Sequence, residues 1–162
     1  LGDIFVFIFF GLIAVSGTYY LQTGFITSNC IILGFSVGAL STAILVVNNL
    51  RDMNADKKHG KKTLAVYLGK RFTKIEYLIL MIIAYIIPIY ISYMLDYKLG
   101  LLIVYFTLPI AARLILELFY QEGVVLNNTL EQTAKLLLLY SILLSFGIIV
   151  WILKKLNLIH IN

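Results

Sequence analysis

Long uncharged runs separated by short polar stretches dominate the pattern of this chain. No charged residue occurs from position 4 to position 50, which is enough for two membrane spans of about 20 residues each. Polar residues at 22–29 mark a turn, so we predict one span at about Ile4–Leu21 and a second at about Cys30–Asn49. The apolar runs are continuous rather than alternating, and this favours helices over the strands of a membrane barrel.

The second half of the chain continues this pattern. The apolar run Leu64–Gly69 is too short to cross a bilayer, so we expect a short interfacial helix there that caps the preceding polar stretch. Pro88 is expected to kink the span that contains it, because proline removes a helical hydrogen bond. The remaining spans are predicted at about Tyr77–Leu95, Leu99–Tyr120 and Thr133–Leu153, with a short turn at Asp96–Lys98 and a polar loop at Gln121–Glu131.

The composition is that of a membrane protein. Hydrophobic residues make up 61% of the 162 residues and charged residues only 13%, with a mean hydropathy of +0.96, whereas soluble domains carry roughly 25% charged residues. Backbone polar groups in lipid must be satisfied within the protein, which restricts spanning structures to helices and closed barrels. We therefore predict an all-α, polytopic transmembrane helix bundle of about five spans, forming a single membrane domain over residues 1–162.

The net charge of +5 and the pI of about 9.3 are compatible with nucleic-acid binding. The basic residues are clustered, however, as in a loop beside a membrane span, so we expect no nucleic-acid partner. By the positive-inside rule this loop is predicted to be cytoplasmic, in a multi-pass protein of the cell (inner) membrane. The polar loop at 121–132 then lies on the same side, and the two loops could form one mouth. The clustered residues are Arg51, Lys57, Lys58, Lys61, Lys62, Lys70, Arg71 and Lys74.

The densest polar stretch follows the second predicted span directly. Asn48, Asp52 and Asp56 are spaced by four residues. Each such step on a helix drifts by only ~40°, so the three side chains share one face, which we call the acidic face. Oxygen ligands of this kind suit Mg²⁺, which takes one or two carboxylates together with substrate phosphates. We predict that Asp52, Asp56 and Asn48 bind Mg²⁺ and act in catalysis.

Cations follow the acidic face along the chain. Lysine side chains suit phosphate oxygens, so the order of acid first and base second at the mouth of a membrane helix indicates a Mg²⁺–diphosphate site. The positive-inside rule is an alternative explanation of the lysines that needs no chemistry. That alternative does not explain the acidic face. The lysines concerned are Lys57, Lys58, Lys61 and Lys62.

Two further pairs of residues have expected roles in packing. Arg113 and Glu117 are four residues apart within the fourth predicted span, and charges at that depth face protein or a water-filled cavity. We interpret them as a structural ion pair, with contact to substrate as the alternative. Gly34 and Gly38 form a small-xxx-small pair, which suits close packing of two membrane helices.

Three stretches resemble a known family. The stretch "NNLRDMNADKKHGKKTLAVYLG" (Asn48–Gly69) resembles the second aspartate-rich motif of the membrane prenyltransferases of the UbiA superfamily. The segments Phe5–Gly24 and Leu126–Gly147 are similar to the segment before that motif and to the closing helix in the same enzymes. Within the superfamily, the NN-x-RD-x₃-D-x₃-GK-x-TLAV form looks most like the branch that prenylates 1,4-dihydroxy-2-naphthoate.

The resemblance implies a fold larger than this chain provides. Members have nine helices and two aspartate-rich motifs around a lipid-accessible cavity, whereas this chain looks like helices five to nine with only the second motif. The expected partner is therefore the missing N-terminal half of the same bundle, and the chain alone is expected to be inactive. The chain also has Tyr67 where members usually have arginine, with Lys70 and Arg71 as the alternative cations.

The resemblance also implies a reaction. A polyprenyl group would pass from polyprenyl diphosphate to 1,4-dihydroxy-2-naphthoate, with loss of CO₂ and diphosphate, giving demethylmenaquinone for menaquinone biosynthesis. Mg²⁺ would bridge the carboxylates and the diphosphate, and Arg51, Lys61 and Lys62 are candidate diphosphate contacts. Two alternatives remain open. One is a different acceptor, such as 4-hydroxybenzoate, haem or a chlorophyllide; the other is a non-catalytic membrane bundle or transporter whose polar loop binds anionic lipid headgroups.

Overall fold

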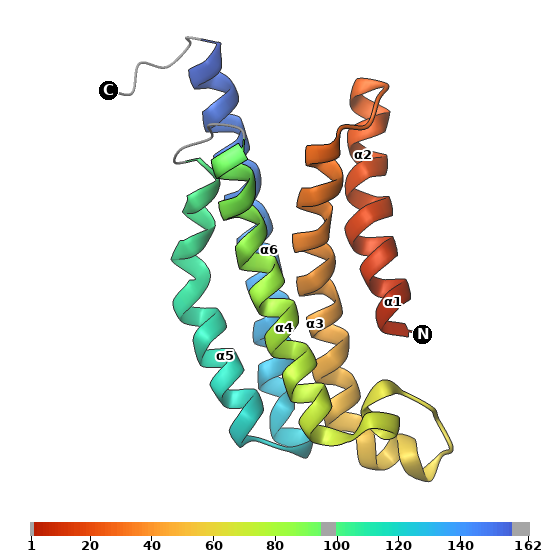
Figure 1. Cartoon of the computed structure of the whole chain (residues 1–162). Helices are drawn as coiled ribbons and strands as arrows, with labels where there is room; N and C mark the ends of the chain where they lie inside the picture. The colour runs from red at the N-terminus through yellow and green to blue at the C-terminus, as the bar shows by residue number, and fades with distance from the viewer. Residues whose placement is uncertain (1, 95–99, 157–162) are drawn as a thin grey trace.

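The chain forms a bundle of long helices that run roughly alongside one another (Figure 1). The computed structural model describes residues 2–94 and 100–156, except for the side chain of Lys155. Within these residues every regular element is helical, and five helices are long and apolar enough to cross a membrane. This confirms the predicted all-α bundle with about five spans.

The first predicted span is one continuous helix. Its parts are α1 (Gly2–Val6), the π-helical segment η1 (Phe7–Ile13) and α2 (Ala14–Thr23). The helix ends at Gly24, which has a left-handed conformation (φ 78°) that suits glycine, and its N–H donates to the Tyr20 carbonyl at 2.8 Å.

The second span is α3 (Ser28–Lys58), which extends well beyond its predicted end at Asn49. It begins at Thr27, whose hydroxyl accepts a hydrogen bond from the Cys30 N–H at 3.2 Å, as an N-cap residue does. Because the helix continues to Lys58 without a break, the whole acidic face is helical, as its four-residue spacing predicted.

The element α4 (Leu64–Met94) is divided by Gly69, which has a non-helical backbone (φ 83°, ψ 169°). The residues before Gly69 form the predicted short helix, and in Figure 1 this part crosses the lower end of the bundle before the chain turns up into the long helix. Pro88, the predicted kink position, lies inside the helix, whereas the non-helical backbone is at Gly69.

The segment that connects the last two spans is shorter than the sequence suggested. They consist of η2 (Leu101–Thr107) with α5 (Leu108–Tyr120), then η3 (Gly123–Val125) and α6 (Leu126–Lys155). The predicted loop Gln121–Glu131 was wrong in extent, because its second half is the first turn and a half of α6. Leu126 and Thr129 are fully buried there, so packing favours helix over loop. The predicted turn Asp96–Lys98 lies outside the described residues.

The helix α3 lies at the centre of the bundle and contacts η1, α4 and α6 (Figure 1). Two buried tyrosines join α4 to α6: the Tyr77 hydroxyl lies 3.0 Å from the Thr133 hydroxyl, and the Tyr140 hydroxyl donates to the Ala84 carbonyl at 2.6 Å. Water is absent from the hydrocarbon region, so such hydroxyls need partners from the protein itself.

Glycines allow the first helix to pack directly on α3. A Cβ atom added at Gly11 would lie 2.6 Å from the Gly38 Cα and 2.7 Å from the Gly34 carbonyl oxygen. Both neighbours are backbone atoms, which cannot rotate away. The predicted packing role of Gly34 and Gly38 is therefore confirmed, with Gly11 as the residue that they meet.

We expect Gly11→Ala to destabilise the chain by about 1–3 kcal/mol, because the added methyl group overlaps backbone atoms and forces the two helices apart. Gly17→Ala is the matched control on the same helix, since a Cβ atom at Gly17 meets nothing within 4 Å. Thermal unfolding in detergent micelles measures both variants. Equal melting temperatures for the two variants would contradict the proposed close packing.

Candidate functional site

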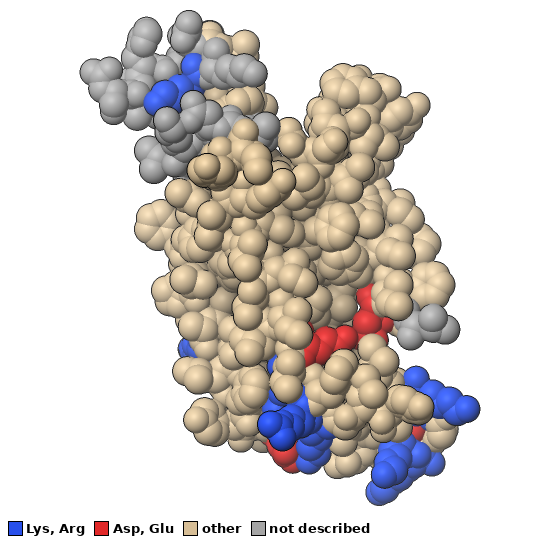
Figure 2. Space-filling view, in the orientation of Figure 1, with Lys and Arg blue, Asp and Glu red and all other residues tan. Residues whose placement is uncertain are grey.

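The two polar loops meet at one end of the bundle, which we call the polar end. On the face shown in Figure 2, much of the basic surface gathers at the lower end of the molecule, where the chain leaves α3 and enters α4. The Arg51 Nη1 donates to the Asn127 Oδ1 on α6 at 3.0 Å, and Lys70 forms an ion pair with Glu122. The two loops therefore lie at the same end of the bundle, as predicted, and the side of the membrane that this end faces stays a prediction.

The guanidinium of Arg51 joins two members of the acidic face. Its Nη2 donates to the Asn48 Oδ1 at 2.8 Å and to the Asp52 Oδ2 at 2.6 Å, while its Nε donates to the Asp52 Oδ1 at 2.8 Å. Two oxygens one helical turn apart thus bind the same nitrogen atom. Asn48 and Asp52 therefore present their oxygens on one face of α3, as the spacing predicted.

Asp56, the third member of the acidic face, is buried and paired with Lys61. The Lys61 Nζ lies 3.0 Å from the Asp56 Oδ1. The end of α3 explains this contact, because Gly60 has a left-handed conformation (φ 70°), the Gly60 N–H donates to the Lys57 carbonyl and the Lys61 N–H to the Asp56 carbonyl. These are the two bonds of a Schellman motif, which turns the chain back over the last turn of the helix.

Lys61 thereby lies close to two carboxylates. Besides its ion pair with Asp56, its charge also acts on Asp52. Lys62, the next predicted diphosphate contact, is exposed and has no ion-pair partner in the part of the chain that the structure describes. The structure thus brings Arg51 and Lys61 onto the acidic face and leaves Lys62 beside it.

The contribution of α6 was missed by the sequence reasoning. Asn127 accepts a hydrogen bond from Arg51, and its position in the second polar loop was the signal that could have identified it. Lys70 and Lys74 also reach across to this region, where Lys74 Nζ donates to the Phe119 carbonyl at 2.8 Å. The hydrogen bond from Lys70, together with its positive charge, lowers the pKa of the exposed Glu122.

The predicted Arg113–Glu117 pair is present. The Arg113 Nε lies 2.7 Å from the Glu117 Oε1, and the Thr129 hydroxyl donates to the Glu117 Oε2 at 3.4 Å. Glu117 is largely buried, whereas Arg113 is exposed. The ion pair lies within α5, and the contact with α6 is the hydrogen bond that Glu117 accepts from Thr129. The structure thus shows the pair, and contact with substrate stays an open alternative.

The acidic face has the donor atoms that Mg²⁺ prefers. Its two carboxylates and one amide supply only oxygen, and the Asp52 side chain is 38% exposed and so open to a ligand. Within residues 2–94 and 100–156, no three His, Cys, Asp or Glu side chains form a group that could hold a metal ion, and the acidic face itself has only two carboxylates. The oxygen donors of these residues suit Mg²⁺. Their roles as ligands stay predictions.

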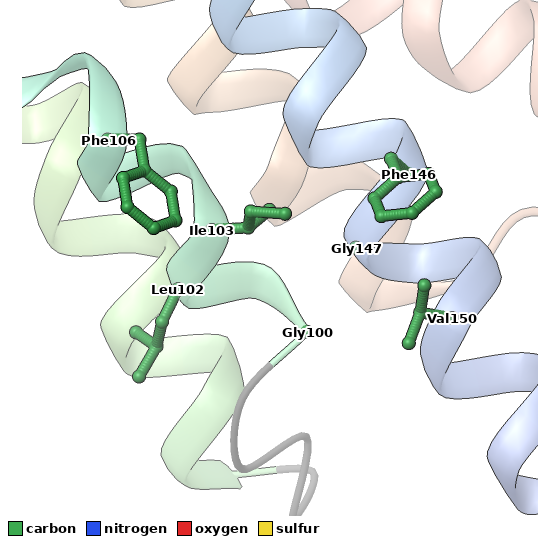
Figure 3. A pocket seen from close by; sticks show the side chains of 7 residues that line it. All are labelled: Gly100, Leu102, Ile103, Phe106, Phe146, Gly147 and Val150. Atoms are coloured by element: carbon green, nitrogen blue, oxygen red, sulfur yellow. The ribbon is translucent and has the colours of Figure 1, made fainter. Parts of the chain in front are cut away.

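An apolar pocket lies in another part of the bundle. The pocket lies between η2 and α6, far along the bundle from the polar end (Figure 3), and its volume is about 340 Å³. A charged substrate head would find no ionic partner among its lining side chains, so it is not the candidate site. It is lined by Gly100, Leu102, Ile103, Phe106, Phe146, Gly147 and Val150.

Comparison with known proteins identifies relatives over almost the whole chain. The model of the UbiA prenyltransferase family matches residues 1–142. A 1,4-dihydroxy-2-naphthoate octaprenyltransferase of Haemophilus influenzae is 37% identical over 153 residues, which are 93% of this chain and 49% of the relative.

Two other relatives are similar to part of the chain or to nearly all of it. The Escherichia coli protein of the same name is 47% identical over 70 residues, 43% of this chain and 23% of its own length. UbiA prenyltransferase domain-containing protein 1 of Homo sapiens is 32% identical over 149 residues, 92% of this chain and 43% of its own length. The chain thus spans about half the length, or less, of these relatives.

We expect Gly60→Ala to destabilise the chain by about 1–2 kcal/mol, because a Cβ atom is unfavourable in the left-handed conformation that closes the Schellman motif. Gly60→Asn is the control, since asparagine tolerates this conformation better, and its melting temperature should lie nearer to that of the original chain. Thermal unfolding in micelles measures both. If alanine and asparagine were equally well tolerated, the conformation of Gly60 would not be what positions Lys61.

Proposed function

Because this chain belongs to the UbiA prenyltransferase family, we propose that it acts in the transfer of a polyprenyl group from polyprenyl diphosphate to 1,4-dihydroxy-2-naphthoate. The transfer releases CO₂ and diphosphate and yields a precursor of menaquinone. The names of the relatives support the acceptor. The observation that carries the proposal is the convergence of Arg51 and Lys61 on the acidic face at the polar end.

In this proposal Asp52, Asp56 and Asn48 hold Mg²⁺. When bound, Mg²⁺ neutralises part of the negative charge that develops on the departing diphosphate. Arg51 and Lys61 donate to the diphosphate oxygens, and their present contacts with the acidic face keep them within reach of it. Lys62, which is exposed, binds the same group from the edge. Fixed charges of this kind act where negative charge builds up in the transition state.

The rest of the bundle keeps water away from the reacting carbon. Loss of diphosphate leaves an allylic cation, which would react with water to form an alcohol, so the reaction needs an apolar environment. The side chains of α3 before the acidic face are mostly apolar, and several of them are buried, including Leu40, Val46 and Val47. In this proposal the polar end binds the charged head of the substrate, and the adjoining apolar residues are the environment for its hydrocarbon tail. The positive-inside rule favours the cytoplasmic side for the polar end.

We expect Asp52→Asn to lower prenyl transfer by roughly 100-fold or more, because it removes a charge that holds the metal and the diphosphate in place. Glu131→Gln is the control, since Glu131 is an exposed carboxylate on α6 that pairs only with Lys135 among the described residues. Membranes from cells that express the complete gene are assayed for prenylated naphthoquinone with Mg²⁺ and with a chelator. Activity of Asp52→Asn near that of the original, or activity that survives chelation, would refute the assignment.

The acceptor is tested separately. We expect the same membranes to prenylate 1,4-dihydroxy-2-naphthoate and to give no product with 4-hydroxybenzoate, haem or a chlorophyllide at equal concentration. Mass spectrometry of the lipid extract identifies the product. Preference for one of the other acceptors would keep the family reaction and reject the naphthoate branch.

A further inference from the structure

The segment of residues 57–72 at the polar end has features that the proposed reaction does not use. It contains the last residues of α3, the loop that follows, the short helix before Gly69 and the first residues after it. We call it the basic–aromatic segment. It exposes large apolar side chains: Tyr67 is 83% exposed, and Leu68 and Phe72 are each 44% exposed. Exposed apolar side chains are common along this bundle. In this segment they lie among exposed cations, which is the combination typical of interfacial helices.

Besides Lys62, which is a proposed diphosphate contact, three cations of this segment have no ion-pair partner in the part of the chain that the structure describes. They are Lys57, Lys58 and Arg71, all exposed. Their neighbours Lys61 and Lys70, by contrast, are paired with Asp56 and Glu122. The sequence pattern placed Lys57 and Lys58 beside a diphosphate site, with Arg71 as an alternative cation there. The contacts proposed above are Arg51, Lys61 and Lys62, and they leave these three cations out. Their positive charge is therefore available to an anion outside the protein.

The backbone gives the segment its orientation. The turn at Gly69 (φ 83°) separates the short helix from the long part of α4, and in Figure 1 the short helix crosses the end of the bundle instead of continuing along it. If the long helices span the bilayer, this helix lies along the membrane surface. Basic atoms on the lower part of the face in Figure 2 lie at this same end.

We propose that the basic–aromatic segment binds the headgroups of anionic phospholipids in the adjoining leaflet. Lys57, Lys58 and Arg71 contact lipid phosphates, while Tyr67, Leu68 and Phe72 lie at the boundary between headgroups and acyl chains. Helices that combine basic residues with aromatic and aliphatic ones bind the interface of anionic membranes in this way, and each basic residue strengthens the attraction. The partner is the lipid bilayer itself, and the proposal does not depend on the prenyl-transfer reaction.

The experiment places a fluorophore on the segment. The full chain carries Cys30→Ala, which removes the buried native thiol, and Tyr67→Cys, which takes an environment-sensitive label. In neutral-detergent micelles it is titrated with brominated phosphatidylglycerol or brominated phosphatidylcholine, which quench a label that they contact. We expect half-maximal quenching at a roughly tenfold lower lipid fraction for phosphatidylglycerol, and loss of this preference at about 0.5 M salt, where charges are screened.

Variants in the labelled background separate charge from fold. Lys57→Gln, Lys58→Gln and Arg71→Gln together should make the two lipids equal, whereas Lys57→Arg, Lys58→Arg and Arg71→Lys together should keep the preference. Singly, Lys57→Gln should reduce the preference several-fold and Lys154→Gln, an exposed lysine near the other end of the bundle, should leave it unchanged. These single changes remain informative if the triple glutamine variant does not fold.

Three results would overturn the proposal. The first is an unchanged preference in a folded triple glutamine variant. The second is a label that neither lipid quenches. The third is loss of the preference when about 1 mM inorganic diphosphate is added, because the cations would then belong to the diphosphate site. Retention of the preference in diphosphate is the result that we expect.

Discussion

The contacts of the Arg51 guanidinium hold the polar end together. One side of the group binds Asn48 and Asp52 on α3, and the other binds Asn127 on α6. Without a cation at this point, the oxygens of the acidic face would repel one another where α3 leaves the membrane. The site is therefore also part of the packing, because the residue that neutralises the carboxylates joins two helices that lie far apart in the sequence.

The apolar part of the bundle obeys a related constraint. A hydroxyl group in lipid has no water to bind, so it must find a partner in the protein. Ser41 and Thr42 donate to carbonyls one turn earlier on α3, and Tyr77 and Tyr140 join α4 to α6. Among the described residues, the Ser92 Oγ is the buried side-chain oxygen that lacks a partner. Internal hydrogen bonds thus fix how the helices pair, and glycine contacts fix how closely they approach.

The polar end separates two kinds of cation. Arg51 and Lys61 contact the acidic face, while Lys57, Lys58 and Arg71 extend to the surface. The Schellman motif at the end of α3 causes part of this division, because it turns the chain after Gly60 and returns Lys61 to Asp56. The first group suits a substrate phosphate, and the second suits the membrane. Neighbouring basic residues in one run can therefore suit a substrate phosphate and the membrane, since the end of α3 turns some side chains toward the acidic face and others toward the surface.

Much of the fold was determined by the sequence alone. Uninterrupted apolar runs of sufficient length must become helices in lipid, and residues four apart on a helix must share a face. For these reasons the five spans, the register of Asn48 and Asp52 and the packing of Gly34 and Gly38 were predictable from local pattern. The tertiary structure decided the rest. That α3 continues to Lys58, that the second polar loop is mostly helix, and that Asn127 meets Arg51 all depend on contacts between distant segments, whose energies no local pattern contains.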